Sequence, residues 1–123
     1  MKMTSNEEIM KKLAVEKVNT GRCDELLGGN SALYLKLMKK FMDDPDFENL
    51  GKAIDSGDLK GQEDSAHSLK GVSGNLGIDL MYRNFSEIVA VRRNQAQADV
   101  KADYDEAMES RRKIIKILED FNG

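Results

Sequence analysis

Apolar residues recur at helical spacing in one segment of this chain after another, and this pattern limits the possible folds more than any other feature. Between residues 31 and 43 the stripe consists of Leu33, Leu37, Met38 and Phe41. No segment alternates apolar and polar positions with β-branched residues, as a half-buried strand would. Residues that favour helix, such as Lys, Glu, Leu, Met and Ala, are plentiful, and there is one proline. The sequence therefore predicts an all-α fold.

Capping residues and helix breakers divide the chain into six expected helices. These cover about residues 5–18, 31–43, 45–56, 58–75, 79–91 and 99–121. Ser5, Asp58 and Asp79 are the expected N-caps of three of them, since their side-chain oxygens can accept from free backbone N–H groups. Gly57 and Gly77 are expected to end the preceding helices. A connector with a short turn is expected over residues 19–29, and a polar link over residues 92–98.

Short loops between helices of similar length imply antiparallel neighbours. We therefore expect an antiparallel up-down four-helix bundle with additional short N-terminal helices. The bundle helices would be those starting near Ser31, Asp58, Asp79 and Asp99, with a bundle core of about residues 30–121. A chain of this length is enough for one domain with one hydrophobic core, here residues 1–123.

The apolar stripes predict which side of each helix faces the core. The first helix has a modest stripe and is expected to pack on the side of the core. In the helix over residues 58–75 the expected seam is Leu59, Ala66, Leu69, Ser73 and Leu76. In the last helix the expected side is Tyr104, Met108, Ile115, Leu118 and Phe121. Arg111 interrupts that side, and its aliphatic stem is expected to lie there with the charge reaching water.

The bulk properties exclude several classes of function. The formal net charge is -3, which argues against wholesale binding to nucleic acid or to an anionic membrane. No apolar run approaches the roughly 20 residues that span a bilayer. The polar N-terminus lacks the apolar stretch of a signal peptide, and the single cysteine, Cys23, permits no internal disulfide. We expect a cytoplasmic monomer without membrane insertion.

The only histidine, His67, falls outside the expected seam of its helix. On a helical projection its stripe contains Lys60, Glu63, Asp64, Lys70, Gly71 and Gly74. Each glycine inside a helix costs about 0.5–1 kcal/mol relative to alanine, so two of them need a reason. Close approach of another macromolecule to His67 is one reason, and tight packing against a neighbouring helix is the other. Spacing alone leaves both open.

An exposed imidazole is mostly neutral at neutral pH and is a good nucleophile. A phosphoryl group on the His67 ring would carry negative charge, which Lys70, one turn on, could partly neutralise. The sequence offers no second histidine, no paired cysteine and no nucleophile–base pair for metal binding or hydrolysis. It also has no glycine-rich nucleotide loop after a strand. His67 is therefore expected to exchange phosphate with a partner and not to draw it from ATP unaided.

Residues 67–77 read His-Ser-Leu-Lys-Gly-Val-Ser-Gly-Asn-Leu-Gly. This stretch resembles the signature of histidine-containing phosphotransfer (HPt) domains: a His followed by Leu-Lys-Gly, then a small residue, and an apolar-Gly pair that closes the helix. The resemblance covers about Asp24 to Val91 well. The first helix and the chain after Arg92 are similar only in helical character.

The resemblance implies a phosphorelay carrier and not an autonomous kinase or hydrolase. His67 would accept a phosphoryl group from the aspartyl phosphate of one receiver domain and pass it to the aspartate of another. Lys70 would stabilise the group and Gly71 would give it steric access. The partners would be response-regulator receiver domains and a hybrid sensor histidine kinase. The receiver would supply Mg²⁺, and the chain would need no cofactor of its own.

By geometry alone, Glu63, Asp64 and Gly74 are expected docking positions for the partner. Two other functions remain open at this stage. One is a helical adaptor that binds a partner without phosphotransfer, and the other is the dimerisation module of an ATP-dependent kinase. The Met1 start and the complete set of helices favour a free-standing protein over a piece of a hybrid kinase.

Overall fold

The computed structural model describes residues 4–94 and 98–122, and these residues contain seven α-helices and no strand. The helices are α1 (Asn6–Val15), α2 (Arg22–Leu27), α3 (Ser31–Met42), α4 (Asp46–Ser56), α5 (Leu59–Leu76), α6 (Asp79–Arg93) and α7 (Lys101–Leu118). The predicted all-α fold class is confirmed. No helix in the described part of the chain is long and apolar enough to cross a membrane.

Most helix ends form where the sequence predicts them. The side chain of Ser5 accepts a hydrogen bond from the Glu8 N–H at 3.1 Å. The side chain of Asp58 accepts one from the Gly61 N–H at 2.9 Å. Gly57 and Gly77 end α4 and α5 with positive φ angles of 72° and 79°, which favour glycine. These short-range interactions are the ones that a single sequence encodes most directly.

Several helix boundaries differ from the prediction. Helix α1 ends at Val15 and not near residue 18, and α7 covers Lys101–Leu118 and not residues 99–121. Asp79 is the first residue of α6 and not its cap, because Ile78 occupies the cap position with its side chain buried. The segment expected to be a connector contains the short helix α2, and α6 continues to Arg93. Residues 95–97 of the expected polar link lie outside the described residues.

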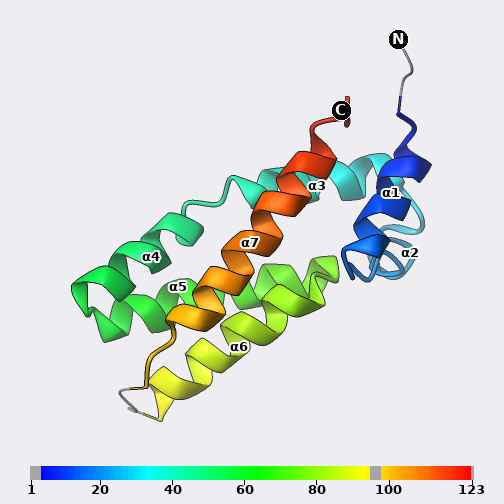
Figure 1. Cartoon of the computed structure of the whole chain (residues 1–123). Helices are drawn as coiled ribbons and strands as arrows, with labels where there is room; N and C mark the ends of the chain where they lie inside the picture. The colour runs from blue at the N-terminus through cyan, green and yellow to red at the C-terminus, as the bar shows by residue number, and fades with distance from the viewer. Residues whose placement is uncertain (1–3, 95–97, 123) are drawn as a thin grey trace.

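Helices α5 and α6 form the central pair, and they run in opposite directions on either side of the turn at Gly77 (Figure 1). Helix α4 packs on α5, α7 packs on α6, and α3 lies against α7. The core that they enclose is apolar, with Phe47, Leu69 and Phe85 fully buried. Among the described residues, no helix packs along one side of α5 and the adjoining side of α6, apart from α2 near the turn at Gly77.

The expected core side of α3 is confirmed at Met38 and Phe41, which are buried, and wrong at Leu33 and Leu37. Leu33 and Leu37 are more than a third exposed, whereas Tyr34 and Leu35 are fully buried. The Tyr34 hydroxyl donates a hydrogen bond of 2.5 Å to the Leu76 carbonyl oxygen. Burial raises the pKa of that hydroxyl, which keeps it protonated as a donor. Tyr34 thus has a polar partner inside the core, while Leu33 at the preceding position lies at the surface.

The seam expected on α5 is confirmed at Ala66, Leu69, Ser73 and Leu76, and the side expected in the last helix is confirmed at Leu118 and Phe121, all of which are buried. The remaining positions differ. Leu59 is exposed because it lies in the first turn of α5, beyond the cover of its neighbours; Gln62 takes a buried place one turn later. In α7 the fully buried positions are Ala107, Ile114 and Leu118. Tyr104, Met108 and Ile115 are only partly buried beside the core.

Arg111 explains the shifted side of α7. Its Nε and Nη2 atoms donate to the Met42 carbonyl oxygen at 2.9 and 2.6 Å. Its guanidinium carbon lies 4.9 Å from the centre of the Phe47 ring. The guanidinium therefore does not simply extend into water, as expected, but caps the last turn of α3 and stacks on the core.

The N-terminal segment covers one end of the central pair. Ile9 and Leu13 of α1 are fully buried against α3 and α7, a deeper position than the modest stripe predicts. The Asn19 N–H donates to the Gly77 carbonyl at 2.7 Å. A Cβ atom at residue 77 would lie 2.3 Å from the Asn19 carbonyl oxygen. Glycine is thus required at the α5–α6 turn both by its φ angle and by the contact with Asn19.

Candidate functional site

The side of α5 that no helix covers carries His67. The opposite side of α5 is buried and consists of Gln62, Ser65, Ala66, Leu69, Ser73 and Leu76. His67, Asp64 and Gly71 are exposed, and Glu63, Lys70 and Gly74 are partly exposed. The structure therefore places all six of the predicted site residues on one accessible surface, which we call the His67 face.

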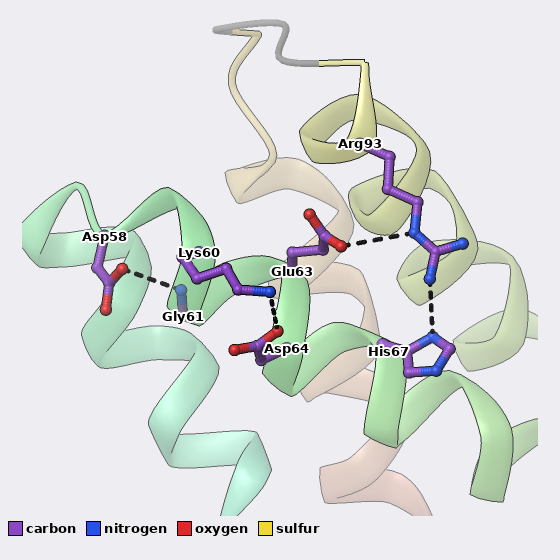
Figure 2. Close-up of polar contacts among 7 residues, drawn as sticks. All are labelled: Asp58, Lys60, Gly61, Glu63, Asp64, His67 and Arg93. Atoms are coloured by element: carbon purple, nitrogen blue, oxygen red, sulfur yellow. Dashed lines mark hydrogen bonds and ion pairs between the residues drawn. The ribbon is translucent and has the colours of Figure 1, made fainter.

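Arg93, at the end of α6, reaches across to two residues of the His67 face (Figure 2). Its Nη2 atom lies 3.5 Å from Nδ1 of His67. Its Nε atom lies 3.5 Å from Oε2 of Glu63, which is one helical turn before His67. The second ring nitrogen of His67, Nε2, lies on the side of the ring away from Arg93. Arg93 thus contacts Nδ1, while Nε2 lies on the opposite side of the ring.

Asp64 forms an ion pair with Lys60 on the outer edge of the His67 face (Figure 2). The Nζ–Oδ1 distance is 3.0 Å, and both side chains are more than 60% exposed. The hydrogen bond from Lys60 to the Asp64 carboxylate raises the pKa of Lys60. Because a fully exposed pair of this type contributes little to stability, both charges stay available to a partner.

Lys70 lies beside an aromatic ring from the neighbouring helix. Its Nζ atom is 5.8 Å from the ring centre of Tyr82 on α6, a distance at which the ring attracts a cation. The Tyr82 side chain is partly exposed, so this contact restrains the lysine at the surface without burying its charge. The Lys70 ammonium group is held on the same side of α5 as His67.

The two glycines of the His67 face have different surroundings. A Cβ atom at Gly74 would lie 2.9 Å from Cδ2 of the Tyr82 ring, so the ring needs a glycine there. A Cβ atom at Gly71 would meet no atom within 4 Å. Packing between helices therefore accounts for Gly74, whereas nothing in the described part of the fold accounts for Gly71.

A shallow hollow lies where α5, α6 and α2 meet. Its lining comprises Arg22, His67, Lys70, Gly71, Gly74, Asn75, Asp79 and Tyr82. Arg22, which α2 contributes, forms an ion pair with Glu25. The hollow thus brings the imidazole together with the ammonium group of Lys70, the guanidinium group of Arg22 and the carboxylate of Asp79. A second, mostly apolar hollow lies between α3 and α5, with Leu37, Phe41 and Val72 in its wall.

Sequence reasoning missed Arg93, Tyr82 and Arg22, because all three come from helices other than α5. A usable signal exists for two of them. Glu63 and Arg93 are equally distant from Ile78 along the chain, and so are Gly74 and Tyr82. In two antiparallel helices joined by a tight turn, such positions face each other. Arg22 has no comparable signal, since α2 is not part of that pair.

The residues that the structure describes contain no group of three His, Cys, Asp or Glu side chains placed to hold a metal ion. Comparisons of the chain with protein-family models, with curated proteins and with solved structures found no match. The residue pattern of the chain and the geometry of the His67 face are therefore the features that indicate a function.

Proposed function

We propose that this protein is a phosphorelay carrier of the HPt type, in which His67 reversibly accepts a phosphoryl group. The observation that carries the proposal is Gly71, an exposed glycine inside α5 with open space where a side chain would be. Such a glycine costs about 0.5–1 kcal/mol relative to alanine, and the fold offers no compensation. Access of a partner protein to the imidazole explains both the glycine at position 71 and the exposed position of His67.

The chemistry proposed for His67 is a transfer between nitrogen and oxygen. The Nε2 lone pair attacks the phosphorus of an aspartyl phosphate on a receiver domain. The P–N bond forms, the P–O bond to the aspartate breaks, and the aspartate leaves as a carboxylate. Delivery to a second receiver reverses these bond changes. Lys70, restrained by Tyr82, offsets part of the negative charge on the phosphoryl group.

The partners in this proposal are response-regulator receiver domains and a hybrid sensor histidine kinase. The receiver supplies Mg²⁺ and most of the catalytic groups, and this chain has no kinase or hydrolase activity of its own. Glu63 and Asp64 are the proposed docking positions at one end of the His67 face. Gly74 contributes indirectly, because the Tyr82 ring lies over it. The protein is proposed to act as a cytoplasmic monomer.

The HPt proposal extends to the architecture. The helices α3, α5, α6 and α7 are those expected to form an antiparallel up-down four-helix bundle, with α1 and α2 as the additional N-terminal helices. Helix α4 then continues the α3 side of the bundle past the turn at Pro45, and the whole chain is one phosphotransfer domain.

The direct test is phosphate uptake from a panel of receiver domains carrying a radioactive aspartyl phosphate. Wild-type protein is expected to gain label that is lost in acid and kept in alkali, as phosphohistidine is. His67→Gln is expected to gain none, because the chain has no other histidine. Thermal unfolding of both proteins checks that the variant is folded.

Equal labelling of wild type and His67→Gln would contradict the proposal, as would absence of label with every receiver tested. Receiver binding without any label, unchanged in His67→Ala, would instead identify an adaptor. Self-association into a stable dimer would favour the kinase dimerisation module.

A further inference from the structure

We propose that Arg93 is a positioning residue that sets the tautomer of His67 and thereby holds the free protein in its less reactive form. The tautomer assignment stands on geometry alone, whereas its consequence for phosphoryl uptake rests on the proposed function above. The observations behind it are the two contacts of the Arg93 guanidinium, one with the imidazole and one with Glu63.

The Arg93 contact determines which ring nitrogen of His67 carries the proton. A guanidinium group has N–H donors and no acceptor, so Arg93 can only donate to Nδ1 of His67. A neutral imidazole has one N–H group and one nitrogen with a free lone pair. Because Nδ1 receives the Arg93 N–H at an N–N distance of 3.5 Å, its lone pair points to Arg93 and the ring proton is on Nε2.

The position of the ring proton determines how readily His67 attacks a phosphoryl group. Attack on phosphorus needs a nitrogen lone pair that is free and accessible. In the arrangement described, the Nδ1 lone pair is engaged by Arg93, and Nε2, on the opposite side of the ring, carries the proton. For Nε2 to attack, Arg93 must leave Nδ1 and the ring proton must pass from Nε2 to Nδ1 through water. After transfer, the phosphoryl group is on Nε2 and the proton is on Nδ1.

Glu63 offers the Arg93 guanidinium a partner when it leaves His67. Glu63 is already in contact with the Arg93 Nε atom at 3.5 Å, and its carboxylate is less exposed than the guanidinium. A guanidinium and a carboxylate pair most strongly through two parallel hydrogen bonds. A small rotation of the Arg93 side chain would exchange the His67 contact for such a pair. Glu63 and His67 thus compete for one guanidinium.

The test uses nuclear magnetic resonance of the imidazole nitrogens, because a chain with one histidine gives one unambiguous set of signals. At a pH well above the titration range of imidazoles, wild type is expected to show mainly the tautomer with the proton on Nε2. Arg93→Met keeps an aliphatic stem and removes every donor. We expect it to raise the ratio of the Nδ1–H to the Nε2–H tautomer several-fold.

Arg83→Met is the matched control, because Arg83 lies on the same helix and pairs with Glu106 and not with His67. It is expected to leave the tautomer ratio unchanged. Glu63→Gln weakens the competing pair and is expected to shift the ratio further toward Nε2–H. An unchanged ratio in Arg93→Met would overturn the proposal whatever the protein does with phosphate.

Phosphoryl uptake from a receiver gives the second readout. Arg93→Met is expected to take up label several-fold faster than wild type and Arg83→Met at the wild-type rate. Slower uptake in Arg93→Met, despite a shifted tautomer ratio, would contradict the claim that Arg93 holds the free protein in a less reactive form. It would show that Arg93 assists the transfer. Absence of label in every protein would refute the carrier function, while the tautomer shift would still show that Arg93 sets the position of the ring proton on His67.

Discussion

At the scale of single residues, Gly71 and Gly74 show how two glycines one turn apart on α5 serve different ends. Gly74 makes room for the Tyr82 ring, and Gly71 faces open space. The exposed side of α5 and the position of His67 on it were predictable, because helical periodicity fixes which residues share a side. The reason for each glycine was not, since it depends on a ring contributed by α6.

This difference gives a paired prediction for the glycines. Gly71→Ala is expected to raise the free energy of unfolding by about 0.5–1 kcal/mol, because alanine favours helix and its Cβ meets no other atom. The same change is expected to slow phosphoryl uptake, because the methyl group faces the partner. Urea unfolding and label uptake measured on one preparation test both effects.

Gly74→Ala provides the matched comparison. Its Cβ would lie 2.9 Å from the Tyr82 ring, so the ring must move and the gain from helix propensity is cancelled or reversed. In a Tyr82→Ala background the same substitution is expected to become stabilising. If Gly74→Ala stabilises the wild-type protein as much as Gly71→Ala does, the Tyr82 contact does not constrain residue 74.

At the scale of helices, Arg111 couples α7 to the end of α3 and to the ring of Phe47. Arg111→Met is expected to lower the free energy of unfolding by about 1.5–3 kcal/mol, since it removes a charged donor from a main-chain oxygen that has no other side-chain partner in the described residues. Urea unfolding followed by circular dichroism measures the loss.

The next residue supplies the control. Arg112 is exposed and pairs with Glu109 on the same helix. Arg112→Met is therefore expected to leave the free energy of unfolding nearly unchanged. Equal losses in the two variants would mean that the Met42 carbonyl does not depend on Arg111.

The helices also show where sequence patterns stop being informative. Caps such as Ser5, Asp58 and Gly57 were predictable because their hydrogen bonds span only a few residues. The core side of α7 was not, because it depends on a bond from Arg111 to Met42, which is distant in the sequence. The core side of α3 depends in the same way on the bond between Tyr34 and the Leu76 carbonyl.

At the scale of the whole molecule, α1 belongs to the core although its sequence predicts only a weak helix. Leu13 is fully buried, whereas Val15, two residues later, is 79% exposed. Leu13→Ala is expected to lower the free energy of unfolding by about 2–5 kcal/mol. Val15→Ala is expected to change it by no more than about 0.5 kcal/mol.

The same pair separates stability from function. Leu13 does not line the hollow at His67. Label uptake per folded molecule is therefore expected to be equal in wild type, Leu13→Ala and Val15→Ala at a temperature where all three are folded. A specific loss of uptake in folded Leu13→Ala would show that α1 shapes the His67 face.

The tight turn at Gly77 has a consequence for the lengths that this chain can tolerate. Glu63 contacts Arg93, and Gly74 lies against Tyr82, because the two members of each pair are equally far from Ile78 along the chain. One residue inserted into α5 between His67 and the turn would rotate His67 by about 100° relative to α6 and separate it from Arg93. A single insertion or deletion within α5 or α6 between residues 63 and 93 is thus expected to disrupt these contacts, even at positions where a substitution is tolerated. In this segment the contacts between α5 and α6 depend on the number of residues between two positions as much as on the side chains themselves.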